Sequence, residues 1–169
     1  METAFDELLH GKLYDAAAMK LQVDEWRAAG QKIVFTNGIF DLVHIGHITY
    51  LSKAAKLGHK LIIGLNSDDS VKRLKGGNRP INDQKSRASL LAALFFVSGV
   101  VIFDELTPQK LIASLLPDVL VKGSDYAINF IVGAEDVIIN GGSVQTIDFV
   151  DGYSSTRIIE KIRNQVSEA

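Results

Sequence analysis

Two histidines stand three residues apart in the stretch GIFDLVHIGH, which follows an apolar run. If a helix begins here, His44 and His47 project from the same side of its first turn. Their ring N–H groups can donate to adjacent phosphate oxygens, and the start of a helix adds free backbone N–H groups and partial positive charge. Gly46 keeps the turn open, so a ligand can come close to the backbone. The stretch therefore predicts a phosphate-binding site.

A purely structural role is the alternative for this pair. His44 can cap the helix, and His47 can fill a gap in the core. Several residues accompany the two histidines, and the combination favours phosphate binding over the structural role. These residues are Gly38, Phe40, Asp41 and Gly46.

A basic segment, KRLKGGNRP, lies further along the chain between glycines and a proline. Its composition predicts a mobile loop over the site, running from Lys72 to Pro80. A solvated charged turn explains the same composition. The four basic residues of the segment are Lys72, Arg73, Lys75 and Arg79.

A third segment, SSTRIIEKI, begins an expected helix with hydroxyl residues. Ser154 can act as the N-cap of this helix. The backbone N–H groups of Ser155 and Thr156 can bind phosphate at the helix start. Capping alone explains one serine, whereas three consecutive hydroxyl residues after DGY favour phosphate binding.

The elements that must position these groups follow from the alternation of patterns along the chain. Five short apolar runs are separated by segments with helical character: KIVFTNG, KLIIGLNS, VVIFDE, DVLVKGSD and SVQTIDFVD. Because the runs lack polar alternation, both faces of their sheet must be covered. The pattern predicts a Rossmann-like three-layer α/β sandwich with a five-stranded parallel sheet. Helices are expected at 47–57, 83–97, 108–116, 133–140 and 154–166.

Residues 1–30 are expected to form an N-terminal helical extension, and residues 31–169 the main domain. In an open parallel sheet, ligands bind beyond the carboxyl ends of the strands. The polar residues that follow strands are therefore candidates for the site. They are Thr36, Asn37, Asp41, Asn66, Ser67, Asp68, Lys122, Ser124, Asp125 and the segment from Asp151 to Thr156.

Composition excludes several classes of function. A formal net charge of -2 over 169 residues gives no overall attraction to nucleic acid or anionic membrane. The absence of cysteine excludes a disulfide framework, a zinc–thiolate site and thiol catalysis, and suits a reducing compartment. The acidic first residues do not suit a secretory signal, and no apolar run is long enough to span a bilayer. We expect a cytoplasmic protein without a membrane partner.

The stretch GIFDLVHIGH resembles the signature of the nucleotidyltransferase superfamily. That superfamily includes glycerol-3-phosphate cytidylyltransferase, phosphopantetheine adenylyltransferase and, more remotely, class I aminoacyl-tRNA synthetases. The segments NSDDSVKRLKGGNRPIN, LVKGSDY and DGYSSTRII are similar, in order and spacing, to the adenylyltransferase half of the bacterial bifunctional enzyme that makes ADP-heptose. The similarity runs from about Lys32 to Ile162.

The resemblance implies transfer of AMP from ATP to D-glycero-β-D-manno-heptose 1-phosphate with release of pyrophosphate. It implies that His44, His47 and Lys75 are catalytic. It also implies that Arg79 and Arg87 bind the substrate phosphate, although a surface ion pair explains Arg87 equally well. The implied nucleotide-binding residues are Thr36, Gly38, Ile39, Phe40, Asp41, His44, His47, Asn66, Asp125, Ser154, Ser155 and Thr156.

ATP is then a co-substrate, and Mg²⁺ is expected to arrive on its phosphates, since no cluster of His, Asp and Glu has the spacing of a protein metal site. The sugar-kinase half of the bifunctional enzyme is absent from the sequence, so a separate kinase must supply the sugar 1-phosphate. Relatives are commonly dimers, which makes a homodimer possible. Arg157 stands where the heptose enzymes tend to carry an uncharged residue, which predicts a different phosphate environment. Asp125 can equally be a turn residue.

Other functions remain open at this point. A cytidylyltransferase that acts on glycerol 3-phosphate or a similar polyol phosphate has the same phosphate site. A nucleotide-binding regulatory module has the same fold, but it has no need of so many transition-state donors. A fragment of an RNA-binding synthetase is disfavoured by the acidic charge balance and by the absence of a KMSKS-like segment.

Overall fold

A six-stranded parallel sheet forms the centre of the protein, in a computed structural model that describes residues 11–124, 130–148, 150 and 152–167. The strand order is β1-β4-β3-β2-β5-β6, and every neighbouring pair is parallel. The strands are β1 (Leu13–Tyr14), β2 (Ile33–Gly38), β3 (Lys60–Asn66), β4 (Gly99–Phe103), β5 (Val119–Gly123) and β6 (Ser143–Ile147). The parallel α/β architecture is confirmed, and the sheet has one strand more than predicted.

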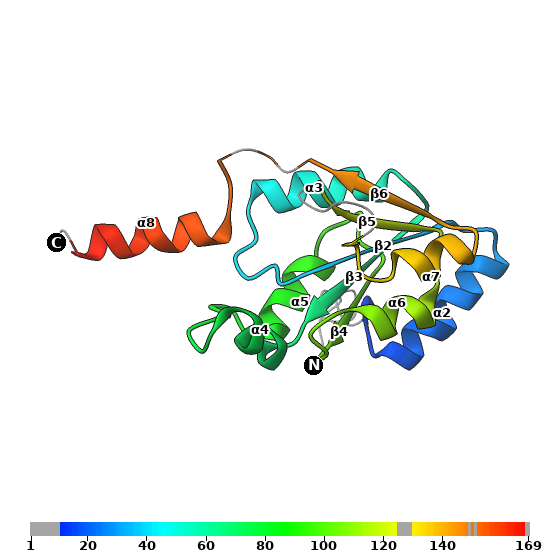
Figure 1. Ribbon diagram of the computed structural model, residues 1–169, viewed down its shortest axis with the longest axis horizontal. Coiled ribbons are helices and arrows are strands. Elements are labelled where there is room, and N and C mark those ends of the chain that lie inside the picture. The colour runs from blue at the N-terminus through cyan, green and yellow to red at the C-terminus, as the bar shows by residue number, and fades with distance from the viewer. Residues whose placement is uncertain (1–10, 125–129, 149, 151, 168–169) are drawn as a thin grey trace, which may run out of the picture.

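Helices cover both faces of the sheet (Figure 1). They are α2 (Ala16–Ala28), α3 (Ile45–Ala55), α4 (Asp68–Lys75), α5 (Gln84–Ala92), α6 (Gln109–Leu115), α7 (Ala134–Ile139) and α8 (Ser155–Ser167). One buried cluster joins α3 and α5 to the sheet, and a second joins α2, α6 and α7 to the other face. Helix α8 extends away from the sheet (Figure 1). None of the helices in these ranges is long and apolar enough to cross a bilayer.

The sixth strand comes from the segment that was predicted as a helical extension. Leu13 pairs with Val100 of β4, so β1 forms the edge of the sheet. Helix α2 follows, with the Asp15 carboxylate accepting from the Ala18 backbone N–H at 2.7 Å as an N-cap. Met19 and Val23 of α2 are fully buried in the core. Residues 11–30 are therefore built into the sandwich, while residues 1–10 lie outside the described part of the chain.

Helix α4 was not predicted, because its second half, residues 72–75, was assigned to the basic loop. Its start is capped by Ser67, whose Oγ accepts from the Ser70 N–H at 3.0 Å. Acidic residues occupy its first turn and basic residues its last turn, which suits the helix dipole. The helix ends at Gly76, whose φ of 93° is accessible to glycine but strained for other residues. The predicted loop from Lys72 is thus helical as far as Lys75.

The boundaries of the other predicted elements need small corrections. Helix α3 begins at Ile45 rather than at residue 47, and α5 ends at Ala92 rather than at residue 97. Strand β6 ends at Ile147, whereas the predicted run continued to Asp151. Asp125 and Asp151, both predicted near the site, lie outside the described residues.

Candidate functional site

A cavity of about 520 Å³ opens at the carboxyl ends of β2, β3 and β5, where the fold predicts a ligand. Nine of the site residues that the family resemblance implies line it: Gly38, Ile39, Phe40, Asp41, His47, Asn66, Lys75, Arg79 and Ser155. Five others do not line it: Thr36, His44, Ser154, Thr156 and Arg87. The remaining wall includes Leu74, Leu106, Pro108, Ile131 and Val132. They were not predicted, because the sequence pattern of apolar wall residues does not differ from that of core residues.

A tight turn after β2 connects the sheet to the histidine pair. Phe40 adopts a φ of 48°, which is uncommon for a residue other than glycine. A Cβ at Gly38 would lie 2.9 Å from the Phe40 ring, so only glycine fits there. The ring is buried and meets the His47 imidazole edge to face, with centroids 5.1 Å apart. The turn therefore sets the position of His47 at the cavity wall.

The two histidines lie together at the start of α3, as the spacing predicted. His44 occupies the N-cap position, but its side chain makes no capping hydrogen bond, which removes the capping explanation. The rings of His44 and His47 are stacked, with centroids 3.9 Å apart and planes at 21°. Both ring nitrogens of His44 and Nδ1 of His47 are buried without a partner among the described residues. Buried polar atoms are seldom left unpaired, and such groups are suited to receive a ligand.

Burial keeps both imidazoles neutral. The pKa of His47 is lowered to about 4; desolvation by burial is the largest cause, the neighbouring His44 also lowers it, and a hydrogen bond with the Leu42 backbone acts in the opposite direction. Desolvation also lowers the pKa of His44. A neutral imidazole carries one N–H donor and one acceptor. At neutral pH each histidine therefore carries one ring N–H. That of His44 has no partner among the described residues, and a phosphate oxygen would compete with the Leu42 backbone for that of His47.

The lowered pKa of His47 predicts a pH dependence of stability. The folded protein takes up this proton only near pH 4, whereas the unfolded chain takes it up near 6.5. The unfolded state thus holds more protons between these values, so the free energy of unfolding should fall as pH drops through this window. Urea unfolding from pH 4.5 to 7.5 measures it. A His47→Gln variant should lose part of the slope, and a slope identical to wild type would contradict the assignment.

Gly46 is packed closely against His44 and Tyr153. A Cβ at this position would lie 3.0 Å from the His44 ring and 3.2 Å from Cβ of Tyr153. The Tyr153 ring also stacks on His44, with centroids 6.4 Å apart. The glycine therefore allows the start of α3 to pack between the histidine and the segment that leads into α8.

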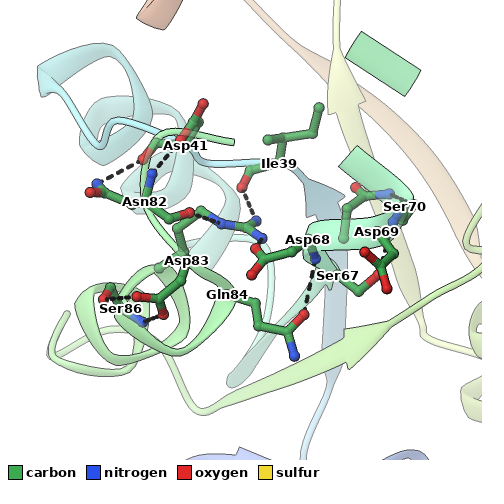
Figure 2. A network of polar contacts seen from close by, with 12 residues as sticks. Ile39, Asp41, Ser67, Asp68, Asp69, Ser70, Asn82, Asp83, Gln84 and Ser86 are labelled. Carbon is green, nitrogen blue, oxygen red and sulfur yellow. Dashed lines mark hydrogen bonds and ion pairs between the residues drawn. The ribbon is translucent and has the colours of Figure 1, made fainter. Parts of the chain in front are cut away.

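Asp41, predicted as a nucleotide contact, holds a loop in this structure (Figure 2). Its carboxylate is only 1% exposed. Oδ1 accepts from the backbone N–H groups of Ile81 at 2.7 Å and Asn82 at 3.0 Å, and Oδ2 accepts from Arg79 Nε at 2.5 Å. The Asn82 amide donates back to the Asp41 carbonyl at 3.0 Å. These bonds place Arg79 at the cavity wall, while both carboxylate oxygens of Asp41 are already in use.

Arg87, predicted as a phosphate ligand, is fully buried and bonded on every side. Its guanidinium donates to the carbonyl oxygens of Asn82 at 3.0 Å and Ile39 at 2.7 Å, and to the Asp68 carboxylate at 2.8 Å. It therefore connects α5, the turn after β2, the loop at residue 82 and the start of α4. The ion pair of Arg87 with Asp68 is buried on the arginine side rather than at the surface, and Arg87 holds the frame around the cavity. Its phosphate contact stays a prediction.

The start of α8 reaches the site through Ser155. Its Oγ donates to the Leu42 carbonyl at 3.1 Å, close to the histidine pair in the chain. Ser154 caps the helix as predicted, because its Oγ accepts from the Arg157 N–H at 3.1 Å. Thr36 is buried and shares a hydrogen bond of 2.8 Å with the Tyr50 hydroxyl, so its side chain supports α3 rather than the cavity wall.

The sequence is similar to those of known proteins over most of its length. The family model described as cytidylyltransferase-like matches residues 35–161. The bifunctional protein HldE of Histophilus somni is 48% identical over 164 residues, covering 94% of this chain and 34% of that protein. HldE of Campylobacter jejuni serotype O:2 is 58% identical over 135 residues, covering 80% and 28%. This chain thus spans about a third of these curated relatives.

A solved structure is also similar. The lipopolysaccharide core biosynthesis protein from Thermoplasma volcanium superposes with a TM-score of 0.57 at 30% identity. The match covers 74% of this chain and all of that one.

Proposed function

Because this chain belongs to the cytidylyltransferase-like family and is a nucleotidyltransferase, we propose that it transfers AMP from ATP to D-glycero-β-D-manno-heptose 1-phosphate. The products are ADP-heptose and pyrophosphate. An oxygen of the sugar phosphate forms a bond to the α-phosphorus of ATP, and the bond from that phosphorus to the departing pyrophosphate breaks. The similarity to HldE over most of the chain supports this choice of substrate.

The stacked histidine pair is the observation that carries the proposal. Two anions must approach each other in this reaction, so positioning and charge stabilisation matter more than a protein nucleophile. His44 and His47 lie at a helix start with unpaired, buried ring nitrogens, and His47 faces the cavity. Their N–H groups are preorganised donors for α- and β-phosphate oxygens as negative charge develops. Preorganised donors stabilise the transition state most strongly where water is excluded.

Other groups complete the proposed phosphate site. Lys75 and Arg79 both line the cavity, one from the end of α4 and one from the loop that Asp41 holds. We assign Lys75 to the departing pyrophosphate and Arg79 to a substrate phosphate. Mg²⁺ enters with the ATP phosphates as part of the co-substrate. Ser155, which also lines the cavity, places the start of α8 beside the same phosphates.

The proposal extends to the setting of the enzyme. We place it in the cytoplasm, where ATP is available. A separate sugar kinase is proposed as the source of the sugar 1-phosphate, from the resemblance to the bifunctional enzyme. A homodimer is proposed from the resemblance to dimeric relatives.

A cytidylyltransferase that acts on glycerol 3-phosphate is the second candidate, and the cytidylyltransferase-like family match favours it. Its phosphate chemistry is identical, so the two candidates differ only in the base and in the acceptor. Substrate choice therefore has to be measured.

The deciding experiment measures pyrophosphate release with Mg²⁺ for ATP and CTP, each crossed with both anomers of heptose 1-phosphate and with glycerol 3-phosphate. The proposal predicts release with ATP and the β-anomer, and little in the other combinations. Release with CTP and glycerol 3-phosphate would replace the proposed substrates by those of the second candidate. If no combination releases pyrophosphate while ATP still binds, the protein is a nucleotide-binding module instead.

A further inference from the structure

Asn37, at the carboxyl end of β2, has a side-chain oxygen that none of the interactions above explains. Its Oδ1 is buried and has no hydrogen-bond partner among the described residues. The residue lines the 520 Å³ cavity. Asn66, at the end of the neighbouring strand, differs in this respect, because its Nδ2 donates to Ser70 Oγ at 3.0 Å and is tied to α4. The Asn37 side-chain oxygen is therefore available to accept a hydrogen bond from a ligand in the cavity.

The strand places Asn37 away from the histidine pair. Side chains alternate along β2, and Ile33 and Phe35, two positions apart on the same face as Asn37, pack in the cluster beneath α2, α6 and α7. Thr36 points to the other face, where it meets Tyr50 of α3. Helix α3 carries the histidines on that other face. Asn37 therefore lies on the side of the cavity opposite the proposed phosphate donors.

The space around Asn37 depends on a glycine in the next strand. Asn37 stands beside Gly64 in the register of β2 and β3. A Cβ at Gly64 would come within 3.2 Å of Cβ of Asn37 and 2.7 Å of Cζ of Phe35. Gly64 therefore leaves space beside the Asn37 side chain that any larger residue would fill. The position of the amide is thus fixed by the sheet itself, as a recognition group needs.

The chemistry of the unpaired atom restricts its partner. An amide oxygen accepts hydrogen bonds and cannot pair with phosphate oxygens, which at neutral pH are also acceptors. The partner must therefore bring a donor, as a hydroxyl does. Polar side chains from the ends of β3 and β5, Asn66 and Lys122, line the same cavity. A floor with polar groups from three adjacent strands suits a ligand that carries several hydroxyls.

We propose that Asn37 is a specificity-determining residue that accepts a hydrogen bond from a hydroxyl of the sugar-phosphate acceptor. The inference rests on the proposed function, and it identifies the part of the site that recognises the sugar. A pocket built to bind a hydroxyl rejects an analogue that lacks it, because the buried acceptor is then left unpaired. Asn37 would thereby distinguish the correct sugar phosphate from deoxy or shorter acceptors.

The test compares wild type with Asn37→Leu, which has a similar size but no hydrogen-bonding group. Calorimetry measures the Kd of heptose 1-phosphate and of ATP separately. We expect the Kd of the sugar phosphate to rise roughly tenfold to a hundredfold and the Kd of ATP to change by less than about twofold. Asn164→Leu, an exposed amide on α8, is the matched control and should change neither constant. Asn37→Ala serves as a second variant if the leucine variant does not fold.

Acceptors that lack one hydroxyl each provide a sharper readout. One of these hydroxyls is the one that Asn37 binds. Removing it should weaken acceptor binding to wild type but should not change acceptor binding to Asn37→Leu. The inference is overturned if removal of each hydroxyl weakens acceptor binding by the same factor in wild type and in Asn37→Leu. It is also overturned if the variant binds ATP, rather than the sugar phosphate, more weakly than wild type does.

Binding rather than turnover separates this inference from the proposed function. If wild type binds the sugar phosphate through Asn37 but releases no pyrophosphate, the function fails and the inference stands. If wild type is active and Asn37→Leu binds and turns over the sugar normally, the inference fails and the function stands. If wild type does not bind a sugar phosphate, both are wrong.

Discussion

Replacing His47 with alanine is expected to lower kcat by roughly 100- to 1,000-fold, the usual effect of removing one preorganised donor to a developing charge. His47 lines the cavity and stacks on His44, so its loss removes one donor and releases the ring of the other. The effect should be seen mainly in kcat, because the contact strengthens as charge builds in the transition state. Pyrophosphate release under saturating substrates measures it.

The fold should survive this change. The imidazole is buried with an unpaired nitrogen, so its removal relieves a desolvation cost and offsets part of the lost packing. Thermal unfolding of the variant should therefore stay close to wild type. His59→Ala is the control, since His59 is exposed and its Nδ1 accepts only from the Lys32 backbone N–H at 2.8 Å. Near-normal turnover in the His47 variant would rule out the role given to the pair.

Replacing Arg87 with alanine is expected to destabilise the protein by about 3 kcal/mol or more, as the removal of one partner of a buried ion pair generally does. The side chain has no exposed surface, and its loss leaves the Asp68 carboxylate without its partner. The carbonyl oxygens of Ile39 and Asn82 lose their donor as well. Since these atoms hold the walls of the cavity, turnover should fall together with stability. Urea unfolding and the KM for each substrate measure the two effects.

The control for Arg87 lies on the same helix. Lys85→Ala removes an exposed cation from α5 and should change stability by less than about 0.5 kcal/mol. If Arg87 were instead a phosphate ligand, its removal would weaken acceptor binding and leave the free energy of unfolding unchanged. That combination would restore the role implied by the sequence resemblance.

Patterns with strong physical causes were predicted correctly from the sequence. The five apolar runs gave the parallel strands, because only a sheet covered on both faces tolerates such runs. The spacing of His44 and His47 predicted their common direction, since helix geometry alone fixes it. The cavity lies where the ends of those strands meet, as expected for an open parallel sheet.

The missed features depend on contacts between distant segments or on very short elements. Strand β1 has two residues, too few for any periodicity. Helix α4 contains few apolar residues, although Ser67 before two acids and the later basic residues are signals of a capped helix. The partners of Asp41 lie about forty positions further along the chain, so its role in holding the loop has no local signature.

The edge strand β1 has a consequence for where the chain can be divided. The repeating pattern begins at Lys32, and a fragment cut there would keep every group around the cavity. It would nevertheless lose the strand that covers the edge of β4, together with the buried side chains of Met19 and Val23. An uncovered edge offers unpaired backbone groups to other molecules and promotes aggregation. The smallest portable unit for fusion or engineering therefore begins before Leu13, well ahead of the first residue that lines the cavity.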